Sequence, residues 1–173
     1  MFKKCFLLNF LVVLSFILTN SLNANEEEKR NSLYYFKLGV ATPPGMSNYV
    51  SDLPNICIGA RFQKNYYGVD LSANITSIVV INYFSLKSVF LLYPLPEKKH
   101  QLYLGLGPGA GYEVDIFREY GSLNLEGVLG YEFRHHRHFK TFVQFEISQP
   151  VFSGSPYNSK YVPGIALSIG AGF

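Results

Sequence analysis

The sequence predicts an all-β fold, a transmembrane up-and-down antiparallel β-barrel of eight strands. Its composition is rich in residues that favour strands, with 13 Tyr and 15 Phe in 173 residues. Apolar and polar residues alternate with a period of two along most of the chain, which is the pattern of strands with two different faces. Charged residues make up only 16% of the chain. This low share argues against a coiled coil, a disordered chain and a highly charged nucleic-acid-binding protein.

The first 24 residues resemble a secretory signal peptide in their order of parts. Lys3 and Lys4 supply the basic start, residues 6–18 supply the apolar centre, and Ala24 supplies the small residue at the cleavage site. The apolar run is too short for a membrane-spanning helix, which needs about 20 residues. The net charge of the full chain is +3, and cleavage removes two of its positive charges, Lys3 and Lys4. The remaining sequence has no basic patch that would indicate a nucleic-acid partner. We therefore expect a signal peptide over residues 1–24, a flexible leader over 25–32 and a barrel domain over 33–173.

The first four expected strands alternate with different regularity. In the first, Phe36 and Leu38 share an apolar face while Lys37 points to the other side. The second and third strands alternate equally well. The fourth is the least regular, because Val89 and Leu91 lie on the same side as its charged residue. These four strands are expected over Leu33–Ala41, Pro54–Gln63, Tyr66–Ile75 and Asn82–Tyr93.

The last four expected strands are more regular. The fifth carries glycine at every second position from Gly105 to Gly111 and keeps alternating beyond them. It is therefore expected to be a strand rather than a phosphate-binding loop, which would open a helix. Pro108 lacks the N–H that a strand ladder needs, so we expect a bulge or kink there. The four strands are expected over Gln101–Asp115, Leu123–Arg134, Phe139–Ser148 and Pro163–Phe173.

The two faces of these strands differ in charge. The apolar face carries no charged residue, as expected of a face that meets lipid, where a mid-plane Lys or Arg costs about 2–4 kcal/mol. Small residues on the opposite face suit the narrow lumen of an eight-stranded barrel. We expect the charges there to form a salt-bridged network, because a buried charge without a partner is costly. The network comprises Lys37, Arg61, Asp70, Lys87, Glu113, Glu126, Glu132, Lys140 and Glu146.

The connections between the strands alternate in length. Those over residues 64–65, 94–100 and 135–137 are short and polar. Three others are longer and rich in Pro, Gly, Ser and Asn, namely 42–53, 116–122 and 149–162. Only the short apolar connection over residues 76–81 departs from this alternation. Short turns at one end and longer loops at the other are typical of a transmembrane barrel.

The end of the chain carries a more specific pattern. Apolar residues stand at every second position before the last residue, namely Ile165, Leu167, Ile169, Ala171 and Phe173. This pattern resembles the carboxy-terminal signal that the barrel-assembly machinery reads in Gram-negative outer-membrane proteins. Over about Leu33 to Phe173, the chain is similar to the small opacity-type and outer-membrane-protein-A-type barrels.

This resemblance implies an outer-membrane barrel with both termini on the periplasmic side, in contact with lipid and with the assembly machinery. It implies a structural or surface-interaction role in the cell envelope, with no catalytic residue, cofactor or metal. A host or envelope partner would meet the longer loops, whose exposed aromatic candidates are Tyr49, Phe117, Tyr120, Phe152 and Tyr157. A general porin is excluded, because 16 strands of about 10 residues would use the whole mature chain.

Three alternatives remain open from the sequence. The charged lumen could form a narrow channel for ions or small solutes. A lipid A-modifying hydrolase would pair a serine with a nearby histidine. The candidate serines are Ser148, Ser153 and Ser155, but all four histidines (100, 135, 136 and 138) fall in the connections predicted to be periplasmic. A soluble, lipocalin-like exported barrel would bury the apolar face instead of exposing it.

Overall fold

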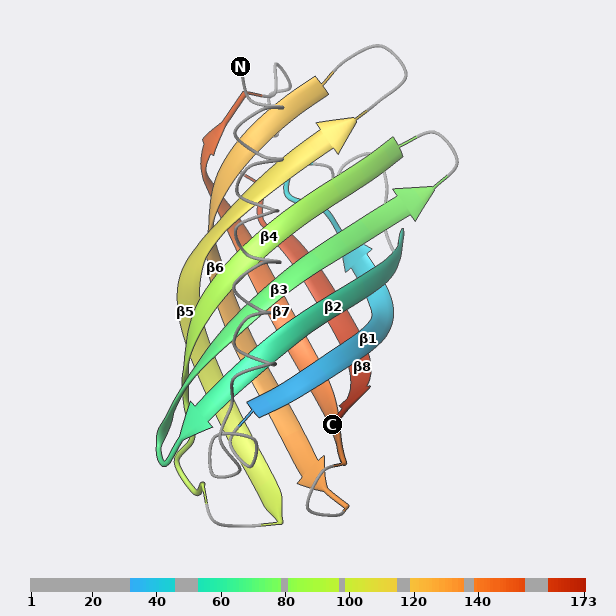
Figure 1. Ribbon diagram of the computed structural model, residues 1–173. Helices are drawn as coiled ribbons and strands as arrows, with labels where there is room; N and C mark the ends of the chain where they lie inside the picture. The colour runs from blue at the N-terminus through green and yellow to red at the C-terminus, as the bar shows by residue number, and fades with distance from the viewer. Residues whose placement is uncertain are drawn as a thin grey trace, which may run out of the picture.

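The protein forms one closed antiparallel barrel in which each strand pairs with its neighbours in sequence and β8 pairs with β1 (Figure 1). The computed structural model describes residues 32–45, 53–78, 81–96, 99–114, 119–135, 139–154 and 162–173. The predicted fold class is therefore confirmed. The strands are β1 Ser32–Thr42, β2 Leu53–Lys64, β3 Tyr67–Ile78, β4 Ile81–Leu92, β5 His100–Val114, β6 Glu119–Arg134, β7 Lys140–Ser153 and β8 Gly164–Gly172.

Each strand overlaps its expected segment, but several are longer than predicted. The β6 strand begins at Glu119 rather than Leu123, and β7 continues to Ser153 rather than ending at Ser148. Gly121 and Pro150 are turn-forming residues, and their local preference favours loops at these positions. Pairing with the neighbouring strands outweighs this local preference, since residues 119–122 pair with β5 and Ser153 pairs with β6.

Of the bulge or kink expected at Pro108, the bulge is absent. Pro108 pairs with Leu125 in an unbroken β5–β6 register. The pairing of β5 with β4 is interrupted beside Pro108, because the proline has no N–H to donate. It resumes in the same register, since no extra residue is inserted. A register shift instead separates the pairs of Leu123 and Asn124 with β7, where Pro150 and Phe152 are the partners. The irregularity thus falls beside a different proline.

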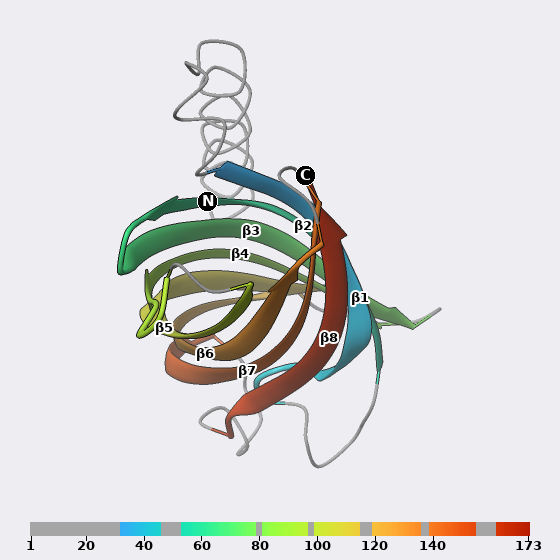
Figure 2. The ribbon, with the colours of Figure 1, turned by 90° about the horizontal axis from the view of Figure 1, so that it is seen from below.

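The strands curve around a common interior (Figure 2). Their apolar face points outward, as predicted. Leu104, Leu129 and Leu167 are 43%, 50% and 52% exposed, whereas Lys37 and Arg61 are 1% exposed. A soluble barrel would enclose the leucines and expose the charges, so the lipocalin-like alternative is wrong. The outward apolar face and the polar interior match the arrangement of transmembrane barrels.

The beginning of β1 and the end of β8 meet at one end of the barrel, the lower end in Figure 1. Tyr34 and Phe173 exchange two backbone hydrogen bonds of 2.9 and 3.0 Å there. We call this the terminal end, and the opposite end the distal end. The β2–β3 turn also lies at the terminal end, where Asn65 has a φ of 53°. Asparagine tolerates this left-handed conformation in tight turns. The part of the chain that the structure describes holds no helix long and apolar enough to cross a membrane.

Candidate functional site

The lumen of the barrel is filled by side chains, and the nine charged residues predicted to line it all lie on its inner face. Two groups of ion pairs hold eight of them together. The ninth, Glu113, is half-buried one residue before the end of β5. Charges enclosed in this way need partners, because the desolvation of each ion costs several kcal/mol.

The first group centres on Arg61 of β2. Its Nε atom donates to Asp70 Oδ2 at 2.7 Å, and its Nη1 atom donates to Glu132 Oε2 at 3.2 Å. Glu132 also forms an ion pair with Lys140 at 3.0 Å, and it lies 3.6 Å from the Nε atom of Arg134. Arg61 and Glu132 are 1% and 0% exposed. A planar guanidinium suits two carboxylates at once, so this group forms a rigid cross-link between β2, β3, β6 and β7.

The second group centres on Glu146 of β7. Lys37 of β1 and Lys87 of β4 both donate to this carboxylate, the latter at 2.7 Å. Lys87 also lies 3.1 Å from Glu126, whose other oxygen accepts a 2.8 Å hydrogen bond from Ser148. The group therefore joins strands from opposite sides of the barrel, with two cations facing two carboxylates.

Gln144 of β7 links the two groups. Its Oε1 atom accepts hydrogen bonds from Arg61 at 2.8 Å and from Tyr103 at 2.7 Å. Its Nε2 atom donates to Glu146 at 3.1 Å. The sequence places Gln144 on the polar face, but its neutral side chain gave no reason to include it in the charge network. Its role depends on the closure of the barrel through the registers of β7 with β8, β8 with β1 and β1 with β2, which the sequence alone does not fix.

Three aromatic rings surround the Arg61 guanidinium. Its Cζ atom lies 4.3, 5.0 and 5.4 Å from the ring centroids of Tyr103, Phe142 and Tyr35. Cation–π contacts of this kind are strongest when water is excluded. Tyr35 also donates a 2.6 Å hydrogen bond to Asp70. The rings thus complete the enclosure of the cation and exclude water from its ion pairs.

Each of these rings lies over a glycine on the neighbouring strand. The directly opposed pairs are Tyr35↔Gly59, Tyr103↔Gly130 and Phe142↔Gly170. A Cβ atom built at any of the three glycines would overlap the ring. Glycine weakens a strand, and a ring covering it restores packing. The small residues of the predicted lumen face therefore make room for rings as well as for charges.

Among the residues that the structure describes, the charges of the interior are balanced. The lumen-facing cations are Lys37, Arg61, Lys87, Arg134 and Lys140, and the carboxylates are Asp70, Glu113, Glu126, Glu132 and Glu146. Equal numbers of opposite charges, cross-linked from most strands, form a plug rather than an open polar pore. The arrangement of these charges therefore favours a cross-linked, closed interior over a path for ions.

Of the three serines considered for lipid A hydrolysis, the two that the structure describes are not close to His100 or His135. Ser148 is 7% exposed and donates to Glu126, and Ser155 lies outside the described residues. Ser153 is half-buried at the distal end of β7. His100 begins β5 and His135 follows β6, both at the terminal end. Among the described residues, no group of His, Cys, Asp and Glu has the geometry of a metal site.

The residues predicted as an assembly signal all face outward along β8. Ile165, Leu167, Ile169 and Phe173 are 50–77% exposed, and Ala171 is exposed as well. The same strand closes the barrel, since it pairs with β7 on one side and β1 on the other.

Two of the five aromatic residues predicted in the longer loops, Tyr120 and Phe152, instead lie on strands, and Phe152 is 55% exposed. Tyr49, Phe117 and Tyr157 lie outside the described residues, as do the predicted signal peptide and residues 25–31 of the leader.

Comparisons with known proteins agree with this architecture. No family model matches the sequence, and no curated protein matches it. Neisserial surface protein A (NspA) has a similar structure, with a TM-score of 0.63, 12% identity, and coverage of 81% of this chain and 93% of that one. The amino-terminal barrel domain of Pseudomonas aeruginosa OprF follows, with a TM-score of 0.56, 14% identity and coverage of 83% and 98%.

A third structure is Ail, the attachment invasion locus protein of Yersinia pestis, in complex with the heparin analogue sucrose octasulfate. It matches with a TM-score of 0.51, 19% identity, and coverage of 82% of this chain and 95% of that one. These identities are low, so the likeness shows the fold. That fold is the small eight-stranded transmembrane barrel of outer-membrane proteins, and it supports an outer-membrane location.

Proposed function

We propose that the protein is a non-catalytic outer-membrane barrel with a structural or surface-interaction role in the cell envelope. It is exported by its amino-terminal signal peptide, with both termini on the periplasmic side. The outward apolar face contacts lipid acyl chains, and the barrel presents its distal loops at the cell surface. A barrel fold supports many roles, so the proposal depends on the contents of the lumen rather than on the fold.

The observation that carries the proposal is the closed, charge-balanced interior. Arg61, Glu132 and Glu146 are at most 2% exposed, and each has at least two partners. An ion that entered this region would have to displace paired charges in a water-poor environment, which is strongly unfavourable. The barrel therefore acts as a rigid support and not as a conduit.

Conductance in planar lipid bilayers tests the closed interior. The wild-type barrel is expected to give no discrete current steps. The double variant Arg61→Ala with Glu132→Ala removes one cation and one carboxylate from the centre of the first ion-pair group, so that the net charge of the lumen is unchanged, and it is expected to give steps. Discrete steps from the wild type would instead favour the narrow-channel function.

Lipid A mass spectra test the hydrolase alternative. They are expected to stay unchanged on expression, and altered acylation that Ser148→Ala abolishes would favour a hydrolase.

The role of the last strand needs a separate test. We propose that the barrel-assembly machinery recognises the outward side of β8. Deletion of Phe173 is then expected to lower the membrane-inserted fraction, measured by heat-modifiable gel migration of extracted protein. Phe173→Tyr keeps an aromatic ring and serves as the control. Normal insertion after the deletion would contradict this recognition.

A further inference from the structure

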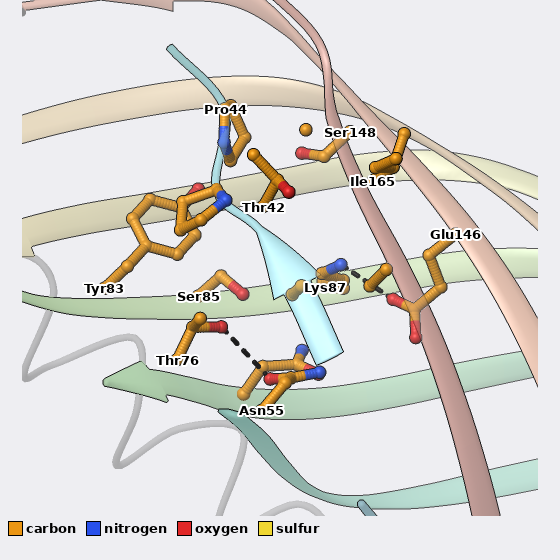
Figure 3. A pocket seen from close by; sticks show the side chains of 15 residues that line it. Thr42, Pro44, Asn55, Thr76, Tyr83, Ser85, Lys87, Glu146, Ser148 and Ile165 are labelled. Atoms are coloured by element: carbon orange, nitrogen blue, oxygen red, sulfur yellow. Dashed lines mark hydrogen bonds and ion pairs between the residues drawn. The ribbon is translucent and has the colours of Figure 1, made fainter. Parts of the chain in front are cut away.

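A cavity lies at the distal end of the lumen, beyond the second ion-pair group (Figure 3). It is bounded by the end of β1, the beginning of β8 and the lumen faces of β2, β3 and β4. Lys87 and Glu146 form its floor, and the dashed line in Figure 3 marks the bond between them. Water can occupy about 30 Å³ of this cavity, which is room for two or three molecules.

One wall of the cavity carries amide and hydroxyl groups from three adjacent strands. Asn55 and Thr76 are directly opposed on β2 and β3, and Thr76 donates a 3.1 Å hydrogen bond to Asn55 Oδ1. Asn74 and Ser85 are directly opposed on β3 and β4. These four side chains are 3–4% exposed. They offer both donors and acceptors within one small area, and none of them is charged.

Asn74 is the most informative residue in this wall. Neither its Nδ2 nor its Oδ1 atom has a hydrogen-bond partner within the described part of the chain, although the residue is 4% exposed. Burying an amide without a partner costs about 1–3 kcal/mol for each unsatisfied group. A bound group that both donates and accepts hydrogen bonds would remove this cost.

The opposite wall is small and apolar. Ala41, Pro44, Gly164 and Ala166 line it, from the end of β1 and the beginning of β8. The floor adds no net charge, because the two cations Lys37 and Lys87 pair with the two carboxylates Glu146 and Glu126. A charged ligand would therefore lose its hydration without gaining a counter-ion. The cavity instead suits an uncharged group with a polar edge and a small apolar face.

We propose that this distal cavity binds a small uncharged polyol, by inserting adjacent hydroxyl groups between Asn74, Asn55 and Ser85. Adjacent hydroxyls match an amide, because one can accept from Nδ2 while the other donates to Oδ1. The carbon backbone of the polyol then contacts Ala41 and Ala166. The inference is independent of the proposed envelope role, since it concerns only the part of the lumen beyond the plug.

Three probes that share a three-carbon skeleton test the proposal: glycerol, the anion glycerate and the cation serinol. The ¹⁵N-labelled barrel, refolded in detergent micelles, is titrated with each probe while the side-chain amide signals of Asn55 and Asn74 are followed. Glycerol is expected to shift both signals saturably. Glycerate and serinol are expected to bind at least about tenfold more weakly, because each would bring an unpaired charge into the cavity.

Two variants should remove the response. Asn74→Ala deletes the unpartnered amide, and Ala166→Leu fills the cavity from the apolar wall. In each, the Asn55 signal is expected to lose its saturable shift. Gln63→Ala is the control, because Gln63 is a buried amide at the terminal end of the same lumen. Heat-modifiable gel migration shows that each variant is folded before it is titrated.

The results separate binding from hydration. A saturable glycerol shift that disappears in Asn74→Ala and Ala166→Leu but persists in Gln63→Ala supports the proposal. A linear shift without saturation would mean that the cavity holds water alone, and the proposal would be wrong. Equal or tighter binding of glycerate or serinol would also overturn it, since the selectivity for an uncharged ligand would be absent.

Discussion

The two halves of the lumen solve the problem of buried polar groups in different ways. Near the terminal end, Arg61 and Glu132 are held by multiple ion pairs, and aromatic rings cover them. Near the distal end, Asn74 is equally buried but has no partner among the described residues. The first arrangement stabilises the fold and closes the barrel. The second leaves both polar atoms of one buried amide without a partner among the described residues, and such an amide calls for a bound group or water to complete its hydrogen bonds.

The largest expected effect comes from breaking the terminal half. Arg61→Ala is expected to destabilise the barrel by about 3–5 kcal/mol, because it leaves buried carboxylates with fewer partners. Urea unfolding in lipid vesicles, followed by gel migration, measures this change. Asn74→Ala, at the same depth of burial in the distal half, is the matched comparison. A loss of stability as large in Asn74→Ala as in Arg61→Ala would remove the distinction between the halves.

A smaller effect tests the rings of the terminal half. Gly130→Ala is expected to cost about 1–3 kcal/mol, because the new methyl group overlaps the ring of Tyr103. Gly127→Ala, on the same strand, is the control, since a Cβ there comes no closer than 3.8 Å to its neighbours. The same unfolding measurement applies to both. If the two variants were equally stable, the packing of rings on glycines would have no role in holding the plug.

The smallest expected effect compares two asparagines that are both 4% exposed. Asn124 donates a 3.0 Å hydrogen bond to the Tyr83 hydroxyl, so Asn124→Ala is expected to cost about 0.5–1.5 kcal/mol. Asn74→Ala removes two buried polar atoms that have no partner among the described residues, so it is expected to leave the free energy of unfolding unchanged or to raise it. Unfolding curves in the absence of added polyol distinguish the two. A larger loss for Asn74→Ala would mean that its amide has a structural partner.

Much of the fold could be predicted because alternation is a local signal. Lys37, flanked by Phe36 and Leu38, already separates the two faces of β1, and the burial of Lys37 shows which of them faces the lumen. The bounds of β6 and β7 were less accurate, because residues such as Gly121 and Pro150 are drawn into strands by their neighbours across the sheet. Strand pairing is a long-range property, and turn-forming residues do not report it.

The charged lumen residues could also be placed on the correct face, but their pairing could not. Whether Glu146 meets Lys37 and Lys87 depends on the registers of several strands and on the closure of the barrel. The sequence places Gln144 and Asn74 on the polar face. Nothing local shows that the amide of Gln144 joins two ion-pair groups whereas the amide of Asn74 has no partner among the described residues. The distal cavity therefore became visible only in three dimensions.

The central claim is that the apolar face meets lipid and the charged face meets the closed lumen. Fluorophores attached to single cysteines at Leu129, Leu167 and Lys64, in a Cys57→Ala background, test it in vesicles. A nitroxide on the lipid chain is expected to quench the fluorophores at Leu129 and Leu167, while aqueous iodide quenches only the one at Lys64. Iodide quenching at the two leucine positions, or no quenching there by either agent, would contradict the claim.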